Sequence, residues 1–252
     1  LVVNGSNLDK DWSWVNKHNT FDCTLENRSH DISLLAIQGP KAVEFLQQFT
    51  GNNLSEITYY TFEHGTFCGI ENIMISATGY TGSGGFEIYV PNEVACAVWD
   101  AVFEAGKSYG IKPIGLAARD TLRLEMGFCL YGNDIDDTTS PIEAGLGWIT
   151  KFTKDFVDSD VLKAQKEQGV SRKLVAFEMI ERGIPRHDYR ILDKNNQVIG
   201  KVTSGTMSPS MKIAIGLGYV DLDHAGQDSE IYIEIRDKGV LAKVVKLPFY
   251  KK

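Results

Sequence analysis

The chain has 252 residues, of which 43% are hydrophobic and 23% charged, and its formal net charge is −7. This composition is typical of a folded globular protein and excludes a disordered chain. The acidic balance, without a basic arm, argues against nucleic acid and anionic membranes as partners, because both bind clustered lysine and arginine.

The first predicted elements are short. Residues 1–4 (LVVN) resemble the end of a β-strand that runs into a turn, so we expect the chain to begin inside an element, with a segment upstream of it absent. A helix is predicted at 9–17 and a strand at 22–27. An apolar strand at 32–37 then ends at Gly39-Pro40, and a helix follows at 41–49.

The next stretch alternates strands with one long helix. Strands are predicted at 59–63, 71–77 and 86–90, with a glycine-rich segment at 79–85 between the last two. Asn92 is the expected cap of a helix whose apolar residues recur on one face as far as Gly110. Hairpins mixed with helices predict an α+β domain of split-βαβ, ferredoxin-like arrangement rather than a doubly wound sheet.

Helical periodicity disappears towards the C-terminus. Strand patterns follow one another at 174–180, 188–193, 197–205, 212–221, 229–237 and 240–249, with turns expected at 195–196 and 238–239. We expect a small antiparallel barrel or sandwich here. The polar stretch 163–171 is the predicted boundary, which gives domains at 1–168 and 169–252.

Cysteine and histidine residues suggest no metal chemistry. The four cysteines are far apart and form no C-x-x-C pair, and none of the five histidines has a recognisable nucleophile partner. We expect reduced thiols and no metal site. No apolar run approaches the length of a membrane span, so we expect no membrane contact and a cytoplasmic location, or the mitochondrial matrix in a eukaryote.

Three stretches contain residues suited to binding. In GYTGSGGFEIYVP (79–91) the glycines allow close approach of a ligand, although their number alone favours an ordinary structural turn. Glu87 lies in an apolar strand, so its carboxylate either points to solvent or has a partner. In 115–136, Arg119, Asp120, Arg123 and Glu125 can be a solvated helix face. The segment 201–210 (KVTSGTMSPS) can simply be a hairpin turn.

Taken together, these stretches are similar to those of glycine cleavage T proteins. The segments 79–91, 115–136, 139–152 (TSPIEAGLGWITKF) and 200–210 occur in the same order and spacing in that family, and 4–12 and 32–40 resemble it as well. The resemblance covers essentially the whole chain. It is most specific in 115–136 and 200–210, whose length makes chance agreement implausible.

The resemblance implies a fold and an activity. The family has a cloverleaf of ferredoxin-like α+β domains and a C-terminal antiparallel β-barrel around a channel that holds tetrahydrofolate. It takes the aminomethyl group from lipoylated H protein, transfers the methylene to tetrahydrofolate and releases ammonia, which requires no metal. The family's folate-binding residues fall on Glu87, Arg119, Tyr80 and Asn4, and Val2 lines the same pocket.

The chemistry of the pterin fits these residue types. A carboxylate accepts from the N–H edge of the ring, and a guanidinium donates to its carbonyl oxygen, so we expect Glu87 and Arg119 to face a common cavity. No nucleophile is needed, since folate N5 attacks the methylene. The family's catalytic aspartate belongs to the segment before Asn4, so the chain holds no catalytic residue, and the resemblance implies impaired turnover.

Two alternatives share this architecture, and one further expectation concerns the partner. A folate-dependent demethylase differs in its methyl donor. A folate-binding accessory protein of iron–sulfur assembly is marked by K-G-C-Y-x-G-Q-E, where this chain has CLYGND at 129–134. For H protein we predict docking at the turn 203–210, aided by four nearby lysines at the basic end of the chain: Lys243, Lys246, Lys251 and Lys252.

Overall fold

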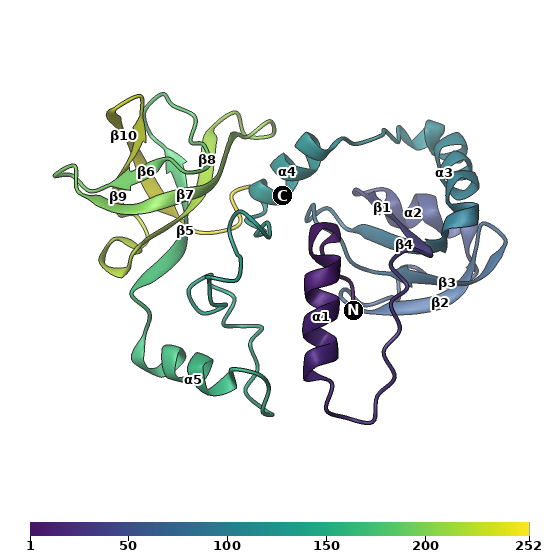
Figure 1. Ribbon diagram of the computed structural model, residues 1–252. Helices are drawn as coiled ribbons and strands as arrows, with labels where there is room; N and C mark the ends of the chain where they lie inside the picture. The colour runs from purple at the N-terminus through teal and green to yellow at the C-terminus, as the bar shows by residue number, and fades with distance from the viewer. Residues whose placement is uncertain (252) are drawn as a thin grey trace. The chain divides into compact units, whose positions relative to one another are not determined.

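The computed structural model describes residues 1–251, which form two compact units, Leu1–Ile114 and Gly115–Lys252 (Figure 1). Each unit has a hydrophobic core of its own. The units divide after Ile114, whereas the sequence predicts a domain boundary after residue 168, and that boundary stays a prediction. None of the helices within residues 1–251 has the length and apolar character needed to cross a membrane.

A four-stranded sheet forms the centre of the first unit. Its strands are β1 (Ile32–Gln38), β2 (Phe62–Phe67), β3 (Ile70–Ser76) and β4 (Gly85–Pro91), in the order β1-β4-β3-β2. The predicted strands at 32–37, 71–77 and 86–90 and the α+β class are confirmed. Every neighbouring pair in this sheet is antiparallel.

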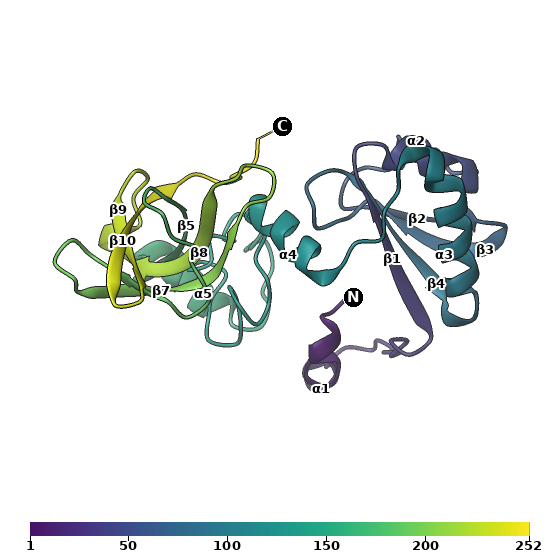
Figure 2. The ribbon, with the colours of Figure 1, turned by 90° about the horizontal axis from the view of Figure 1, so that it is seen from above.

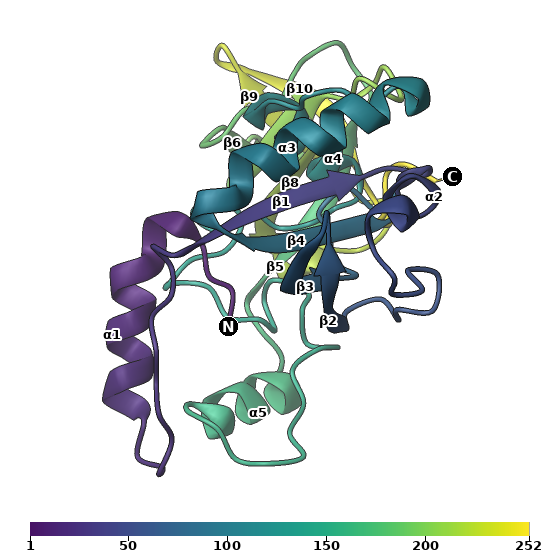
Figure 3. The ribbon, with the colours of Figure 1, turned by 90° about the vertical axis from the view of Figure 1, so that its right-hand side faces the viewer.

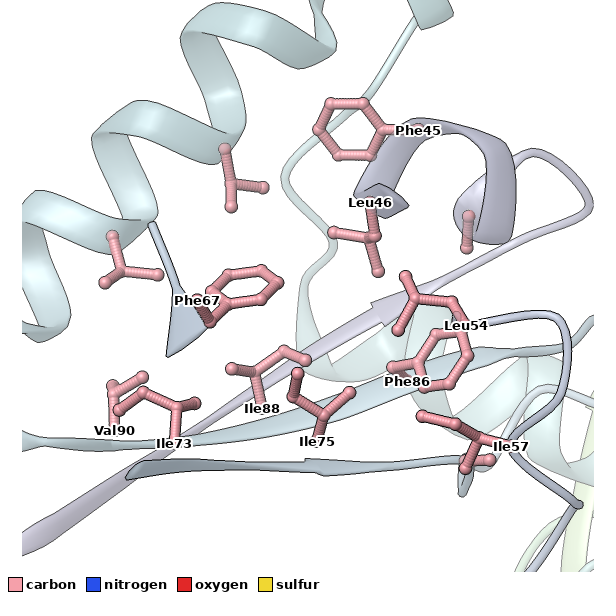
Figure 4. Packing of buried hydrophobic residues seen from close by; sticks show 14 residues of the cluster. Phe45, Leu46, Leu54, Ile57, Phe67, Ile73, Ile75, Phe86, Ile88 and Val90 are labelled. Atoms are coloured by element: carbon pink, nitrogen blue, oxygen red, sulfur yellow. The ribbon is translucent and has the colours of Figure 1, made fainter. Parts of the chain in front are cut away.

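Two helices cover one face of this sheet. They are α2 (Ala42–Leu46), which continues into a 3-10 turn at Gln47–Phe49, and α3 (Asn92–Gly106), which lies along the sheet in Figure 3. Figure 4 shows Phe45 and Leu46 of α2 packed above Ile75, Ile88 and other side chains of the strands. Each buried side chain of this size contributes roughly 1.5–3 kcal/mol to stability. The core therefore fixes which face of β4 remains uncovered.

Asn92 does not cap α3, which corrects the prediction. Pro91 is the N-cap residue, and Asn92 is the first residue of the helix. The Asn92 amide is used elsewhere, because Nδ2 donates to the carbonyl of His30 at 2.6 Å and Oδ1 accepts from Ser33 Oγ at 2.7 Å. The side chain thus ties the start of α3 to the segment that enters β1.

The first thirty residues contain one helix and neither of the two strands expected there. Helix α1 (Leu8–His18) confirms the predicted helix and stands apart from the sheet in Figures 2 and 3. Residues 1–4 and 22–27 belong to no strand, so both strand predictions are wrong. A segment with a strand pattern forms a strand only when a neighbouring strand satisfies its backbone hydrogen-bonding groups. Neither 1–4 nor 22–27 has a neighbouring strand among the described residues.

The second unit contains a closed six-stranded barrel in the order β10-β5-β8-β7-β6-β9, visible at the left of Figure 2. All pairs are antiparallel, which confirms the predicted barrel. The turn expected at 238–239 lies two residues earlier, because Arg236 and Asp237 both have positive φ, as a tight hairpin turn requires. The strands are β5 (Arg172–Met179), β6 (Arg190–Leu192), β7 (Val198–Met207), β8 (Ala214–Asp221), β9 (Glu230–Ile235) and β10 (Lys238–Val245).

Strand β8 crosses the most crowded part of the barrel, and its glycines make room for larger residues. A Cβ at Gly216 would lie 2.4 Å from the ring of Phe177, and one at Gly218 would lie 2.7 Å from Ile191. Phe177 and Ile191 are both fully buried. Small residues on β8 therefore allow two large side chains to fill the barrel interior.

Two helices precede the barrel in the second unit. Helix α4 (Leu116–Glu125) confirms the helix predicted around Arg119, and it packs against β7. Helix α5 (Ser159–Gln168) overlaps the polar stretch 163–171, which is the predicted boundary between the domains. Its hydrophobic residues are too few to give a clear helical stripe, which is why periodicity does not reveal it.

Candidate functional site

Glu87 occupies the middle of the uncovered face of the first sheet. Along β4, Phe86, Ile88 and Val90 are buried against the helices, while Glu87 and Tyr89 alternate onto the opposite face. Glu87 is half-buried. The sequence leaves open whether this carboxylate points to solvent or has a partner, and the structure gives it a partner.

That partner is Thr78, whose Oγ1 donates to Glu87 Oε2. Thr78 Oγ1 also lies 3.0 Å from Ser76 Oγ, and Ser76 is directly opposite Glu87 on β3. On the other side, the residue opposite Glu87 on β1 is Ala36. Both of these neighbours have short side chains, and Glu87 Oε1 accepts no hydrogen bond from the described residues. Glu87 is therefore oriented by one hydroxyl and still able to accept N–H donors from a ligand.

Two tyrosines, Tyr59 and Tyr89, lie close enough to this carboxylate to interact with its charge. The rings of Tyr59 and Tyr60 are 4.1 Å apart, and Tyr60 has a φ of 68°, a left-handed conformation that is uncommon for an aromatic residue. Burial, the neighbouring Tyr60 and the charge of Glu87 raise the pKa of Tyr59 to about 12. Burial and the same carboxylate raise the pKa of Tyr89. The phenols therefore stay protonated at neutral pH, and the face combines one carboxylate with neutral aromatic walls.

The glycine-rich segment before β4 is held by Gln38 at the end of β1. Gln38 Nε2 donates to the carbonyls of Thr78 and Phe86 at 3.1 and 3.2 Å. A Cβ at Gly79 would lie 1.8 Å from Gln38 Oε1, and one at Gly85, whose φ is +124°, would lie 2.3 Å from a backbone oxygen of β1. The glycines are thus required by close packing around one amide, and this amide fixes the path of the chain into Glu87.

The other predicted residues of the first unit lie on two different segments. Tyr80 is half-buried within the glycine-rich segment that Gln38 holds. Val2 and Asn4 are exposed and lie outside any strand, and the carbonyl of Asn4 accepts from the N–H of Asn7 at 2.9 Å. Tyr80 therefore belongs to the same ordered segment as Glu87, whereas Val2 and Asn4 stay predictions.

Arg119 lies on α4 in the second unit and is exposed. Glu87 belongs to the first unit, so their meeting in a common cavity stays a prediction. Arg123, one turn further along the same helix, is only 1% exposed. The interpretation of this helix as a solvated charged face is wrong for Arg123 and Glu125, because both side chains are buried.

A buried network of polar groups surrounds Arg123. Its guanidinium donates to Asp134 at 2.7 Å, to Ser204 Oγ at 2.8 Å and to Asp120 at 2.7 Å. Asp134 accepts in addition from the Thr203 hydroxyl and from the backbone N–H of Leu130. Arg123 and Asp134 are both buried and neutralise each other, while Asp120 is about half exposed, and the hydrogen bonds offset the cost of removing the buried pair from water. The network therefore fixes α4, the segment 130–134 and β7 against one another.

Glu125 makes a second link between the same segments. Its carboxylate accepts from Ser208 Oγ at 2.5 Å, from the Ser210 N–H at 3.0 Å and from Ser210 Oγ at 2.8 Å. The two most specific stretches of the sequence, 115–136 and 200–210, thus bind each other. Sequence reasoning missed this because the partners lie 83 to 85 positions apart.

Docking of H protein at the turn 203–210 stays a prediction, but the hydroxyl groups expected to face the partner are largely occupied within the chain. Thr203, Ser204 and Ser208 are buried, and their hydroxyls bind the charged groups of 120–134. A Cβ at Gly205 would lie 2.5 Å from the carbonyl of Pro185, so this glycine packs against the chain itself. Among the four lysines named with this turn, Lys243 pairs with Asp228 at 3.1 Å, and Lys252 lies outside the described residues.

The side chains that could bind a metal and the thiols are dispersed among the described residues. Within residues 1–251, no group of three or more His, Cys, Asp or Glu side chains could hold a metal ion. The four cysteines are free thiols. Burial and, to a smaller extent, the charge of Asp134 raise the pKa of Cys129 to about 11. Cys129 is therefore protonated, and a weak nucleophile, at neutral pH.

Comparison with known proteins gives a consistent family. Residues 1–154 match the family model described as the GCVT N-terminal domain, and residues 172–251 match the glycine cleavage T-protein C-terminal barrel domain. The chain is 66% identical over 252 residues to an aminomethyltransferase of Flavobacterium psychrophilum and 59% identical to one of Bacteroides fragilis. All of the chain is matched in both cases, and it spans 70% of the length of each relative.

A solved structure agrees with these relatives. Glycine cleavage system aminomethyltransferase T from Bartonella henselae superposes with a TM-score of 0.87 and 31% sequence identity. The match covers 98% of this chain and 67% of that one. On the family models, the curated relatives and this structure, the chain belongs to the glycine cleavage T-protein family and is an aminomethyltransferase.

Proposed function

We propose that this aminomethyltransferase takes the aminomethyl group carried by the lipoyl thiol of H protein and delivers its methylene to tetrahydrofolate. The observation that supports folate as acceptor is the carboxylate of Glu87. It is half-buried at the centre of an uncovered, aromatic sheet face, and Thr78 holds only one of its two oxygens. A flat heterocycle with an N–H edge is the ligand class that such a face suits.

The proposed reaction conserves atoms and charge without a metal. Ammonia leaves the aminomethyl carbon, and N5 of tetrahydrofolate attacks that carbon. The carbon–sulfur bond then breaks as N10 closes the ring. The two protons from N5 and N10 go to ammonia and to the lipoyl sulfur. The products are 5,10-methylenetetrahydrofolate, ammonia and dihydrolipoyl H protein. The work of the protein is to position N5 and to stabilise the developing cation.

Glu87 is proposed to bind the pterin through both carboxylate oxygens. Its Oε1 is available, and Oε2 can accept from the ligand in addition to Thr78, because a carboxylate oxygen has more than one lone pair. Thr78 and Gln38 are positioning residues in this proposal. Thr78 orients the carboxylate, and Gln38 fixes the segment 79–85 that leads into it.

The remaining residues are assigned by the family resemblance. Arg119 is proposed to donate to the pterin carbonyl, and Tyr80 to provide an aromatic wall. Asn4 and Val2 are proposed to line the same pocket. Arg123, Asp134 and Glu125 do not bind folate in this proposal, because their hydrogen bonds are already made within the second unit. They hold α4, and therefore Arg119, in place.

Calorimetric titration tests the folate assignment. Tetrahydrofolate should bind the wild-type chain, and Glu87→Gln should weaken the binding, because the amide offers one acceptor oxygen and places an N–H group against the donors of the pterin. Full retention of affinity in this variant would contradict the assignment. Aminomethylated H protein, compared with sulfonium and N-methyl donors, tests the donor, and only the first should release ammonia.

A further inference from the structure

A groove of about 900 Å³ lies in the second unit, where the ends of several barrel strands meet the segment 180–189. None of the residues proposed to bind folate lines it. Its charged lining residues are exposed, as are Ile180, Met207 and Ile213, while its other apolar lining residues are half-buried or buried. It is therefore an open groove rather than an enclosed ligand cavity. The residues that matter for its chemistry are Ile180, Arg182, Arg186, Met207, Lys212, Ile213 and Arg236.

The groove is basic although the chain as a whole is acidic. Arg182, Arg186, Lys212 and Arg236 line it together with a single carboxylate, Glu181, which leaves a local charge of +3 on a chain of net charge −7. Within residues 1–251, these four side chains form no ion pair. They are therefore available to an anionic ligand.

Glu181 does not reduce this availability. Its Oε2 accepts the backbone N–H of Leu241 at 3.0 Å, which directs the carboxylate to a backbone group rather than to the arginines. The adjacent Gly183 packs tightly, because a Cβ there would lie 2.7 Å from Ile235. The wall that carries Arg182 and Arg186 is thus held close against the end of β9.

Apolar side chains accompany the cations. Ile180 is 57% exposed, Met207 43% and Ile213 36%, and all three line the same groove. Single exposed apolar residues are common on protein surfaces, but three in one concave, charged site are the combination found at protein interfaces. Methionine adapts to differently shaped partners.

We propose that this groove binds an acidic peptide segment of a partner protein, with glutamate or aspartate side chains on the four cations and a leucine-sized side chain on the apolar residues. Charge complementarity supports this occupant, because the groove is positive on an otherwise negative surface. A nucleic acid or an anionic membrane would be repelled by the rest of the chain and would leave the apolar residues unused.

Fluorescence anisotropy with the full chain tests the proposal. The probe is a labelled peptide of alternating glutamate and leucine, compared with glutamate–serine and lysine–leucine peptides, a single-stranded DNA oligonucleotide and phosphatidylserine vesicles. The glutamate–leucine peptide should bind tightest, and its affinity should fall as salt rises. Arg182→Glu with Arg236→Glu should weaken it by about tenfold or more. Ile180→Ser with Ile213→Ser should weaken it by about threefold to tenfold.

Lys173→Glu with Lys194→Glu is the matched control. Both lysines are exposed, lie outside the groove and form no ion pair with a described residue. This pair should change the affinity by less than about twofold. The proposal is overturned if the control pair weakens binding as much as the groove pair, or if the wild-type chain does not bind the peptide. Equal binding of the glutamate–serine peptide, or tighter binding of DNA or vesicles, overturns it too.

Discussion

Arg123 donates to Asp134 at 2.7 Å, and the two side chains are 1% and 0% exposed. Asp134 follows Arg123 by 11 positions, at the far end of the loop that leaves α4. Ser204 of β7 completes the arrangement from the barrel. A charged pair inside the protein is costly when either member is alone, so the helix that carries Arg119 can occupy only one position on the barrel.

Removing the guanidinium should destabilise the second unit strongly. We expect Arg123→Ala to lower the free energy of unfolding by about 3–5 kcal/mol, because the Asp134 carboxylate would remain buried without its partner. Arg123→Lys keeps the charge but loses the fork of donors, so its cost should be about 1–3 kcal/mol. Arg119→Ala, on the exposed side of the same helix, should cost less than about 1 kcal/mol.

Urea denaturation followed by circular dichroism measures all three variants. Equal losses for the Arg119 and Arg123 variants would show that the buried network does not hold α4.

Loss of the Glu87 charge should affect ligand binding and leave the fold intact. We expect Glu87→Gln to weaken tetrahydrofolate binding by about tenfold to a hundredfold, which corresponds to the value of hydrogen bonds to a charged group. Glu71→Gln, an exposed position on β3 of the same sheet, is the matched control and should bind normally. In calorimetry, both variants should keep the melting temperature of the wild-type chain. Only Glu87→Gln should lose affinity for tetrahydrofolate.

The packing of the glycine-rich segment around Gln38 predicts a coupling between two positions. Gly79→Ala should destabilise the first unit by about 1–3 kcal/mol, because its Cβ would lie 1.8 Å from Gln38 Oε1. In a Gln38→Ala background the same substitution should cost about 1 kcal/mol less, since the obstructing side chain is gone. A double-mutant cycle of unfolding free energies measures the difference. Strict additivity would mean that Gln38 does not hold this segment.

Alkaline pH should destabilise the chain through Cys129. Burial raises the pKa of this thiol to about 11, so the folded state keeps its proton where the unfolded state has lost it. The resulting stability is complete below about pH 8.5, where the unfolded thiol titrates, and is lost as the pH rises towards 11. Burial likewise raises the pKa of Tyr219 to about 12, so the loss of folding stability continues to higher pH.

Urea midpoints between pH 8 and pH 11 check this expectation. Cys129→Ala should show a shallower decline than the wild-type chain, and Cys23→Ala, at an exposed thiol, should follow the wild-type curve. Parallel declines in the wild type and the Cys129 variant would contradict it.

Local patterns predicted much of the fold. Alternation identified β1, β3, β4 and the barrel strands, since each buries one set of side chains and pairs with a neighbour. The same reasoning failed at 1–4 and 22–27, where the pattern exists but no neighbouring strand does. It also misplaced the cap at Asn92, whose amide binds His30 and Ser33, residues about sixty positions earlier. Partners that distant are set by tertiary packing.

The sequence predicted the candidate site about as far as it predicted the fold. The family resemblance identified Glu87, and the structure adds Thr78 and Gln38, which place it. Neither could have been selected from the sequence, because a threonine beside a glycine and a glutamine at a strand end are common. Arg123 and Glu125 look like surface charges in the sequence. Their burial depends on hydroxyl groups of β7, which only the closed barrel brings into reach.

Arg123 and Glu125 of α4 lie far in the sequence from their partners in 204–210, and this separation has a consequence for folding. Helix α4 is short, and helices of its length are marginal in isolation. Its two buried charges gain their partners only after β7 has joined the barrel, some eighty residues later in the chain. Closure of such distant contacts is slow. Helix α4 therefore has partners for its buried charges only when β7 is in place, so a lesion that prevents the barrel from forming also leaves the arginine-bearing helix without its anchors.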